Sequence, residues 1–126
     1  MRRKVLGEKG ESLAVSRLEA KGYQILDRNW RTREGELDIV AEDGDTIVFV
    51  EVKARTSRRF GLPEEALTRK KRHHLIKAAL AYLDANQIDN TNWRFDFIAI
   101  EWSKNGELTR MEHLIDVIQA NPGEFI

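Results

Sequence analysis

Three charged side chains lie within two apolar segments that otherwise have the pattern of buried β-strands. The segment from Thr46 to Lys53 reads TIVFVEVK and is apolar on both faces apart from Glu51 and Lys53, which is typical of a strand covered on both sides. Because side chains alternate along a strand, Glu51 and Lys53 share one face. The preceding segment, GELDIV, carries Asp38. Carboxylates on an apolar face are tolerated when they are paired or bind a metal.

The connection between these two segments predicts that Asp38 faces the same side as Glu51. The linking residues EDGD contain Asp-Gly, which is a strong hairpin signal. With a two-residue turn at either Asp43-Gly44 or Gly44-Asp45, the numbers of paired residues add up to an odd value. One register then places Asp38 opposite Glu51, and the other places them diagonally. In either register the two carboxylates lie close enough to share one ion.

This set of groups predicts metal-dependent phosphodiester hydrolysis. Magnesium takes oxygen ligands and keeps waters that can reach a phosphate, which suits two carboxylates on neighbouring strands. The ammonium of Lys53 could stabilise developing negative charge or orient the attacking water. A salt bridge of Lys53 with Glu51 or Asp38 is the structural alternative. The expected cation is Mg²⁺ or Mn²⁺.

The first helix offers a further carboxylate. By helical angle, Glu11 lies centrally among Ala14, Val15 and Leu18 and is expected to point toward the core. Glu8 lies near the same edge and competes for the role. Acidic residues also favour the first turn of a helix because of the helix dipole.

Basic residues gather in the segment from Arg55 to Lys77, although the charges of the 21 basic and 21 acidic residues of the whole chain cancel. Four cations in the first turn of a helix oppose its dipole and repel one another, and function could explain that disadvantage. We expect the segment to contact the phosphates of a nucleic acid, and we expect that nucleic acid to be DNA. The predicted contacts are Arg55, Arg69, Lys70, Lys71 and Arg72.

The remaining polar candidates are predicted to be structural. His73 and His74 are adjacent and diverge by about 100° on a helix, and His113 is solitary. Asp96 is expected to form a hydrogen bond or ion pair with Arg94 or a neighbour. The chain has no cysteine, which excludes disulfides and thiolate nucleophiles.

The elements that must position these groups follow from periodicity and turn signals. We expect helices over Glu8–Lys21, stopped by Gly22, and from an N-cap at Thr68 to about Ala85. Strands are expected at Tyr23–Ile25, Glu36–Ala41, Thr46–Arg55, Trp93–Glu101 and Leu108–His113, with a polar stretch over Arg28–Glu34. The order favours one α/β domain over residues 1–126, with helices on the faces of a mixed sheet.

The location of the protein is predicted from what the sequence lacks. No apolar run approaches the roughly 18 residues of a membrane span. The basic start MRRK leads into Gly and Glu rather than into a signal-peptide core. We therefore expect a cytoplasmic protein with no membrane partner.

The motifs resemble a known family. Asp38 followed by Glu51-Val52-Lys53 is similar to the PD-(D/E)XK nuclease pattern. The longer motifs GELDIV, VFVEVKAR and FGLPEEAL resemble the YraN family of bacterial proteins, related to archaeal Holliday junction resolvases, with coverage from about Gly7 to Val117. The resemblance implies a restriction-endonuclease-like three-layer fold, with a central mixed β-sheet flanked by helices.

The same resemblance implies roles for individual residues. Asp38, Glu51 and the Val52 carbonyl would bind the cation, and Lys53 would be the catalytic lysine. Glu11 matches the helix carboxylate that joins the metal site in resolvase-like members. By analogy with resolvases, the substrate would be branched or junction DNA and the protein a homodimer.

Two other functions fit the same residues. The chain could be a non-catalytic nucleic-acid-binding module that retains the nuclease fold and uses its basic helix and cleft. It could also be a scaffold for other proteins, which would bind neither metal nor nucleic acid. The presence of every required side chain weighs against the non-catalytic module.

Overall fold

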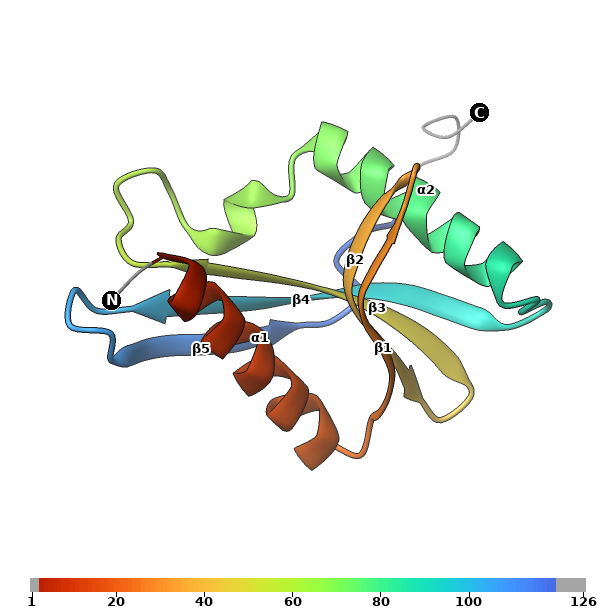
Figure 1. The fold of residues 1–126 in the computed structure, drawn as a ribbon, viewed down its shortest axis with the longest axis horizontal. Helices are drawn as coiled ribbons and strands as arrows, with labels where there is room; N and C mark the ends of the chain where they lie inside the picture. Colours follow the sequence, from red (N-terminus) through yellow and green to blue (C-terminus); the bar gives the residue numbers. More distant parts are fainter. Residues whose placement is uncertain (1–2, 120–126) are drawn as a thin grey trace.

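The computed structural model describes residues 3–119. Helix α1 is followed by three strands, and a short 3₁₀-helix, η1, and helix α2 precede the last two strands (Figure 1). The elements are α1 (Arg3–Ala20), β1 (Gln24–Thr32), β2 (Gly35–Asp43), β3 (Thr46–Arg55), η1 (Pro63–Ala66), α2 (Arg69–Ala85), β4 (Asn92–Trp102) and β5 (Leu108–Leu114).

The strands form one mixed sheet in the order β1-β2-β3-β4-β5. The neighbours β3 and β4 run parallel, and every other neighbouring pair is antiparallel. Parallel neighbours need a crossover connection, which η1 and α2 supply. The predicted mixed sheet is therefore confirmed.

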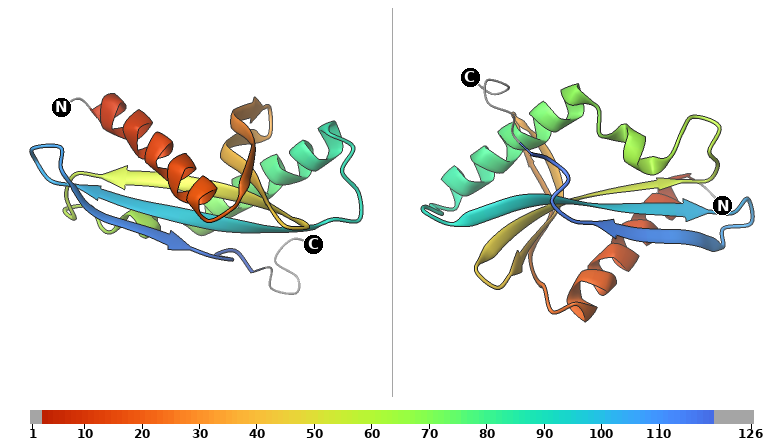
Figure 2. Two further views of the ribbon diagram at one scale, coloured as in Figure 1. Left: turned by 90° about the horizontal axis from the view of Figure 1, so that it is seen from below. Right: turned by 180° about the vertical axis from the view of Figure 1, so that it is seen from behind.

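The two helices cover opposite faces of the sheet and make three layers. Alternate side chains of β3 enter two separate cores: Val48 and Val50 pack with α1, whereas Ile47 and Phe49 pack with α2. Figure 1 shows α1 in front of the sheet, and the view from behind shows the strands in front of α1 (Figure 2, right). The fold is the predicted three-layer α/β arrangement.

Helix α1 begins earlier than predicted and ends within one residue of its predicted end. It begins at Arg3, five residues before the predicted Glu8, and ends at Ala20. Gly22 has φ +90°, donates its N–H to the Glu19 carbonyl at 2.9 Å, and is followed by a bond from Tyr23 N–H to Leu18 O at 3.0 Å. This pair of bonds is a Schellman motif, which a left-handed residue such as glycine completes.

Strand β1 corrects the prediction of a short strand followed by a polar stretch. One strand runs from Gln24 through most of that stretch to Thr32, with a register shift between Ile25 and Asp27. As an edge strand it pairs only with β2, and most of its side chains remain partly or fully exposed. An exposed strand needs no apolar alternation, so the sequence pattern did not reveal it.

The remaining elements agree with their predictions. Strand β3 has the predicted bounds, and β2, α2, β4 and β5 extend or match theirs within one or two residues. The Thr68 side chain accepts a hydrogen bond from Lys71 N at 3.2 Å, so it caps α2 as expected. Within residues 3–119, neither helix combines the length and apolar character needed to cross a membrane.

Candidate metal centre and nucleic-acid interface

The sheet splits between β2 and β3. The hairpin turn consists of Gly44 and Asp45, since Asp43 pairs with Thr46, but pairing of the two strands ends at Ile39 and Val50. Beyond that point β2 still pairs with β1, and β3 still pairs with β4. In Figure 1, β1 and β2 accordingly run steeply away from the direction of β4 and β5.

Asp38 and Glu51 lie at this split. The observed turn selects the register in which they stand opposite each other, one step beyond the last regular pair. In place of a ladder bond, the Asp38 carboxylate accepts the N–H of Val52 at 2.9 Å. The side chain of Asp38 therefore bridges two strands whose backbones have separated.

Two adjoining hollows open at the split and share Asp38, Val52 and Lys53. The α2 hollow has a volume of about 390 Å³ and is lined by Glu36, Asp38, Glu51, Val52, Lys53, Ala66, Leu67, Lys71 and Phe97. The α1 hollow, about 580 Å³, is lined on its other sides by Leu6, Gly7, Glu11, Ala54, Arg55, Thr56, Ser57, Arg59, Phe60 and Trp102. A site at the split is thus open from both helical layers.

Glu51 is a carboxylate in an unfavourable environment for negative charge. Its side chain is 11% exposed. Burial first, and then the neighbouring Asp38 carboxylate, raise the pKa of Glu51 to about 8, although Lys71 opposes the shift. Such crowding of two carboxylates favours a bound proton or cation.

Lys71 is the ion partner of Glu51. Its ammonium lies 3.0 Å from Glu51 Oε2. Burial alone would lower the pKa of Lys71, but the charge of Glu51 and its hydrogen bond outweigh that effect and raise it. The sequence placed Lys71 among the phosphate contacts, and the structure places it inside the α2 hollow.

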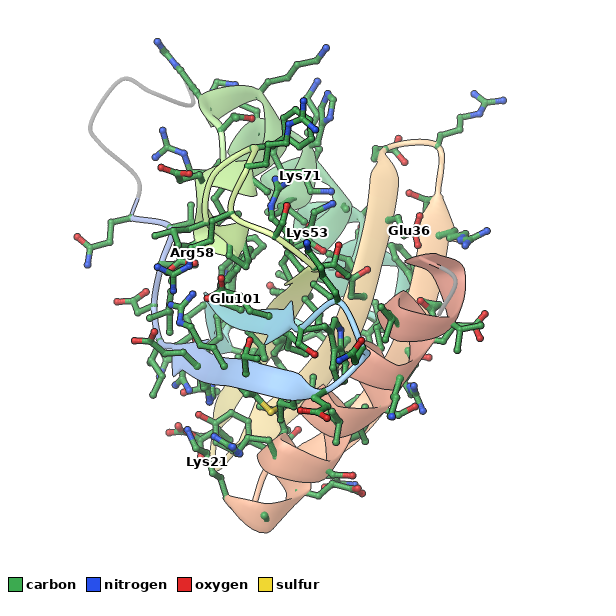
Figure 3. All side chains as sticks on the ribbon, turned by 90° about the vertical axis from the view of Figure 1, so that its left-hand side faces the viewer. Lys21, Glu36, Lys53, Arg58, Lys71 and Glu101 are labelled. Atoms are coloured by element: carbon green, nitrogen blue, oxygen red, sulfur yellow. The ribbon has the colours of Figure 1, made fainter. Side chains whose placement is uncertain are left out.

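Lys53 occupies the rim between the hollows. It is exposed and lines both. Figure 3 shows Lys53, Lys71 and Glu36 at the same open end of the molecule. An exposed ammonium beside two carboxylates is accessible to a ligand approaching from solvent, as a catalytic lysine must be.

The helix carboxylate at the site is Glu11 rather than Glu8. Glu11 lines the α1 hollow, its Oε1 is buried without a hydrogen-bond partner, and burial followed by the charge of Asp38 raises its pKa. Glu8 is exposed. The predicted orientation of Glu11 toward the interior agrees with this placement.

The donor set fits a hard divalent cation. The oxygens of Asp38 and Glu51 are the type of ligand that Mg²⁺ and Mn²⁺ prefer, and burial together with the neighbouring Asp38 disfavours an uncompensated negative charge on Glu51. Among residues 3–119, no three acidic or histidine side chains group around one ion position. Metal binding by Asp38, Glu51 and Glu11 stays a prediction.

The other predicted phosphate contacts surround the hollows. Arg69 and Lys70 are exposed in the first turn of α2, and Arg72 is half-buried in the same turn. Arg55, at the end of β3, lines the α1 hollow. The cluster thus lies at the end of α2 that faces the split, because Lys71 in the same turn reaches Glu51.

Asp96 and His113 form a buried network that lines neither hollow. The Asp96 carboxylate lies 3.0 Å from Arg94 Nε and 2.8 Å from His113 Nε2, and it accepts the N–H of Asp116 at 3.0 Å. Lys21 Nζ lies 2.8 Å from His113 Nδ1 and donates to it, so Nε2 carries the proton shared with Asp96. The predicted ion pair of Asp96 with Arg94 is confirmed.

Two features of the site were not predicted. Glu36 lines the α2 hollow, and one wall of the α1 hollow is formed by Thr56, Ser57, Arg59 and Phe60. The motif FGLPEEAL was a signal for the second feature, because it begins at Phe60 in this wall. Its apolar and acidic composition gave no reason to assign it chemistry.

The sheet, its two helical layers and the carboxylates at the split define a three-layer α/β protein whose fold is consistent with that of nucleases. Comparison of sequences adds the family. Residues 10–100 match the profile described as "Uncharacterised protein family UPF0102", and the chain belongs to this family. The predicted resemblance to the YraN family is confirmed.

Similar proteins occur in several bacteria. A UPF0102 protein of Geobacter metallireducens is 51% identical over 111 residues, covering 88% of this chain and 89% of its own. A UPF0102 protein of Syntrophus aciditrophicus is 44% identical over 117 residues, covering 93% and 91%. One from Geobacter sulfurreducens is 46% identical over 116 residues, covering 92% and 90%. These names state the family and no activity.

Proposed function

We propose that the protein is a metal-dependent endonuclease that hydrolyses phosphodiester bonds in DNA with Mg²⁺ or Mn²⁺. The observation that carries the proposal is the pair of carboxylates at the split in the sheet. Burial, and then the neighbouring Asp38 carboxylate, raise the pKa of the largely buried Glu51 to about 8. Lys53 stands exposed beside them on the rim of both hollows.

Each residue at the split would have its own role in the reaction. Asp38 and Glu51 would hold the cation, with the Val52 carbonyl and Glu11 as further ligands. When bound, the cation supplies Lewis acidity toward the phosphate and lowers the pKa of a bound water. Lys53 would place positive charge where negative charge develops on the phosphate during attack.

The basic residues around the hollows would hold the strand. Arg69 and Lys70 are exposed beside the α2 hollow, and Arg55 lines the α1 hollow. Phosphate contacts of this kind position a nucleic acid without reading its sequence. Arg72 in the same turn of α2 would join them, while Lys71 would act between the strand and Glu51.

One observation favours a second candidate, a nucleic-acid-binding module that does not cleave. The Lys71 ammonium lies 3.0 Å from Glu51 and balances its charge without a metal. A buried carboxylate with a cationic partner can serve a purely structural role. In that case the basic residues would bind DNA while Asp38 and Glu51 remained closed to metal.

The deciding experiment is cleavage of labelled duplex, single-stranded, flapped and four-way-junction DNA with magnesium or manganese. Wild type is compared with Asp38→Asn. Products that need the metal and disappear in the variant support the nuclease, and the preferred DNA tests the proposal of branched substrates. Binding without cleavage, together with no heat of metal binding in calorimetry, would favour the binding module. Light scattering tests whether the active species is the proposed homodimer.

A further inference from the structure

A turn beside the proposed catalytic residues exposes an aromatic side chain to solvent. Phe60 is 75% exposed, a larger fraction than any other large hydrophobic side chain in the described part of the chain. It nevertheless lines the α1 hollow together with Asp38 and Lys53. The ring is therefore both open to solvent and adjacent to the split.

Contacts of its first residue, Arg58, fix the turn that carries Phe60. Gly61 N–H donates to the Arg58 carbonyl at 3.0 Å, which closes a turn with Phe60 at its tip. The Arg58 guanidinium makes two hydrogen bonds, of 2.8 and 3.1 Å, to the two carboxylate oxygens of Glu101 on β4. Arg58 and Glu101 lie next to one another in Figure 3. A bidentate pair of this kind restricts orientation.

Contacts of the residues that follow Phe60 also fix the turn. Glu65 Oε2 accepts the N–H of Leu62 at 2.6 Å. This oxygen lies so close to Gly61 that a Cβ there would be 1.9 Å from it, and Gly61 has φ +101°. Only glycine suits such a position. These contacts fix the backbone of the turn, at whose tip the Phe60 ring is exposed.

The surroundings of the ring select its ligand. The Arg59 guanidinium lies 5.5 Å from the centre of the Phe60 ring, and Arg55 lines the same hollow. An aromatic face combined with cationic groups that track a phosphate backbone is the arrangement that binds single-stranded nucleic acid. A base can stack on the ring only when it is unpaired, because bases inside a duplex are stacked on one another.

We propose that Phe60 is a stacking site for an unpaired base of the DNA strand whose phosphate lies at Asp38, Glu51 and Lys53. The inference rests on the proposed nuclease function and specifies its substrate class. The substrate carries a single-stranded segment next to the cleaved bond. Fully paired DNA lacks a base for this site and binds through phosphate contacts alone.

The test is equilibrium binding of fluorescein-labelled DNA in the presence of magnesium, in a Lys53→Ala background that keeps the strand intact. Four proteins are compared: the background alone, and the background with Phe60→Ala, Phe60→Trp or Leu80→Ala. Leu80 is the matched control, because it is 52% exposed on α2 and lines a different hollow. The probes are a 20-nucleotide single strand and the duplex of the same sequence.

The proposal predicts that Phe60→Ala weakens binding of the single strand about 5- to 150-fold, the range for losing one base stack. Binding of the duplex should change less than about twofold. Phe60→Trp should retain the affinity, and Leu80→Ala should leave both probes unchanged. All variants should melt within about 2 °C of the background, since Phe60 and Leu80 bury little surface.

Three results would overturn the inference, and the third is distinguishable from the other two. If Phe60→Ala binds the single strand as tightly as the background does, stacking is wrong while the nuclease proposal stands. The same conclusion follows if Phe60→Ala weakens both probes equally. If the background binds neither probe, the nuclease proposal fails together with the inference.

Discussion

The Asp38 carboxylate accepts the backbone N–H of Val52 at 2.9 Å, across the point where β2 and β3 separate. Regular pairing would satisfy this N–H with a carbonyl of β2. Because the strands diverge, a side chain takes the place of the carbonyl. Asp38 thus has a structural task as a hydrogen-bond acceptor and a chemical task as a charge beside Glu51.

Substitution of Asp38 can separate these two tasks. Asp38→Asn keeps an acceptor for Val52 but removes the charge, whereas Asp38→Ala removes both. Both variants should lose metal-dependent cleavage by at least about 100-fold. Only Asp38→Ala should also lose about 1–3 kcal/mol of unfolding free energy, the cost of an unsatisfied buried N–H. Plasmid nicking and urea denaturation measure the two effects. Equal stability of the two variants would show that the hydrogen bond contributes nothing.

Lys53 should be required for cleavage and dispensable for folding and metal binding. It is exposed on the rim of both hollows, so Lys53→Ala removes positive charge near the phosphate without disturbing a core. We expect cleavage to fall roughly 10²- to 10³-fold, with an unchanged melting temperature. Calorimetry should still detect manganese binding.

Lys77→Ala is the matched control for Lys53, because Lys77 is an exposed lysine of α2 that lines a different hollow. It should cleave like wild type. A Lys53→Ala protein that cleaves at the wild-type rate would remove Lys53 from the catalytic centre.

The metal-free protein should lose stability as pH rises from about 4.5 to about 8. Burial and Asp38 raise the pKa of Glu51 from its ordinary value of 4.5 to about 8, so in this range the folded state binds a proton that the unfolded state has released. Stability falls with pH wherever the folded state binds more protons. Glu51→Gln should flatten the decline, which thermal melting in EDTA measures. In a domain of this size, each kcal/mol shifts the melting temperature by roughly 3–6 °C.

Magnesium should reverse this dependence for wild type, because a cation at Glu51 replaces the proton and binds best once the carboxyl has ionised. Wild type in magnesium should therefore melt higher than in EDTA, and the difference should grow toward pH 8. Parallel melting curves for wild type and Glu51→Gln across this range would show that Glu51 does not titrate as described.

Lys71 and Lys70 are neighbours in α2, but their substitution by alanine should change different properties of the protein. Lys71 lowers the pKa of Glu51 through the 3.0 Å contact, so Lys71→Ala should move the pH profile of cleavage upward. Lys70 is exposed, and Lys70→Ala should instead reduce the slope of log affinity against log salt by about 0.9 on duplex DNA. Cleavage rates at several pH values and binding at several salt concentrations distinguish the two. An unchanged pH profile in Lys71→Ala would contradict the coupling to Glu51.

The sequence predicted those parts of the site that depend on one hairpin. A two-residue turn fixes the parity of pairing, and parity alone places Asp38 on the face of Glu51. The register itself needed the structure, which shows the turn at Gly44 and Asp45. The split in the sheet could not be foreseen, because it arises from the competing paths of β2 toward β1 and of β3 toward β4.

The features of the site that could not be predicted from the sequence were mainly contacts between segments that are distant along the chain. The pairing of Lys71 with Glu51 joins residues 20 positions apart, and it depends on how α2 packs over β3. Periodicity placed the α2 stripe against a core, but it could not say which strand that core covers. Most of strand β1 beyond Ile25 escaped detection, because its edge position removes the alternation on which strand prediction relies.

Asp96 provides a final prediction, in which stability and function should separate. Its side chain is fully buried, and three donors surround it: Arg94, His113 and the N–H of Asp116. Burial alone would raise the pKa of Asp96, but these hydrogen bonds outweigh it and lower the pKa. A carboxyl with a lowered pKa contributes stability above its ordinary pKa and loses it as pH falls through the folded value. Asp96→Ala should therefore cost roughly 3–5 kcal/mol at pH 7, since it leaves buried donors without their charged partner.

The cost of Asp96→Ala should start to shrink as pH falls below the ordinary Asp pKa of 3.8, because the unfolded chain then binds a proton that the folded Asp96, with its lowered pKa, does not. Urea denaturation at pH 7 and pH 3.5 would measure the change. Because Asp96 lines neither hollow at the split, the fraction of Asp96→Ala protein that remains folded at low temperature should cleave at the wild-type rate. A stable Asp96→Ala protein that has lost cleavage would assign Asp96 to the chemistry instead, and would show that the two networks are coupled through β4.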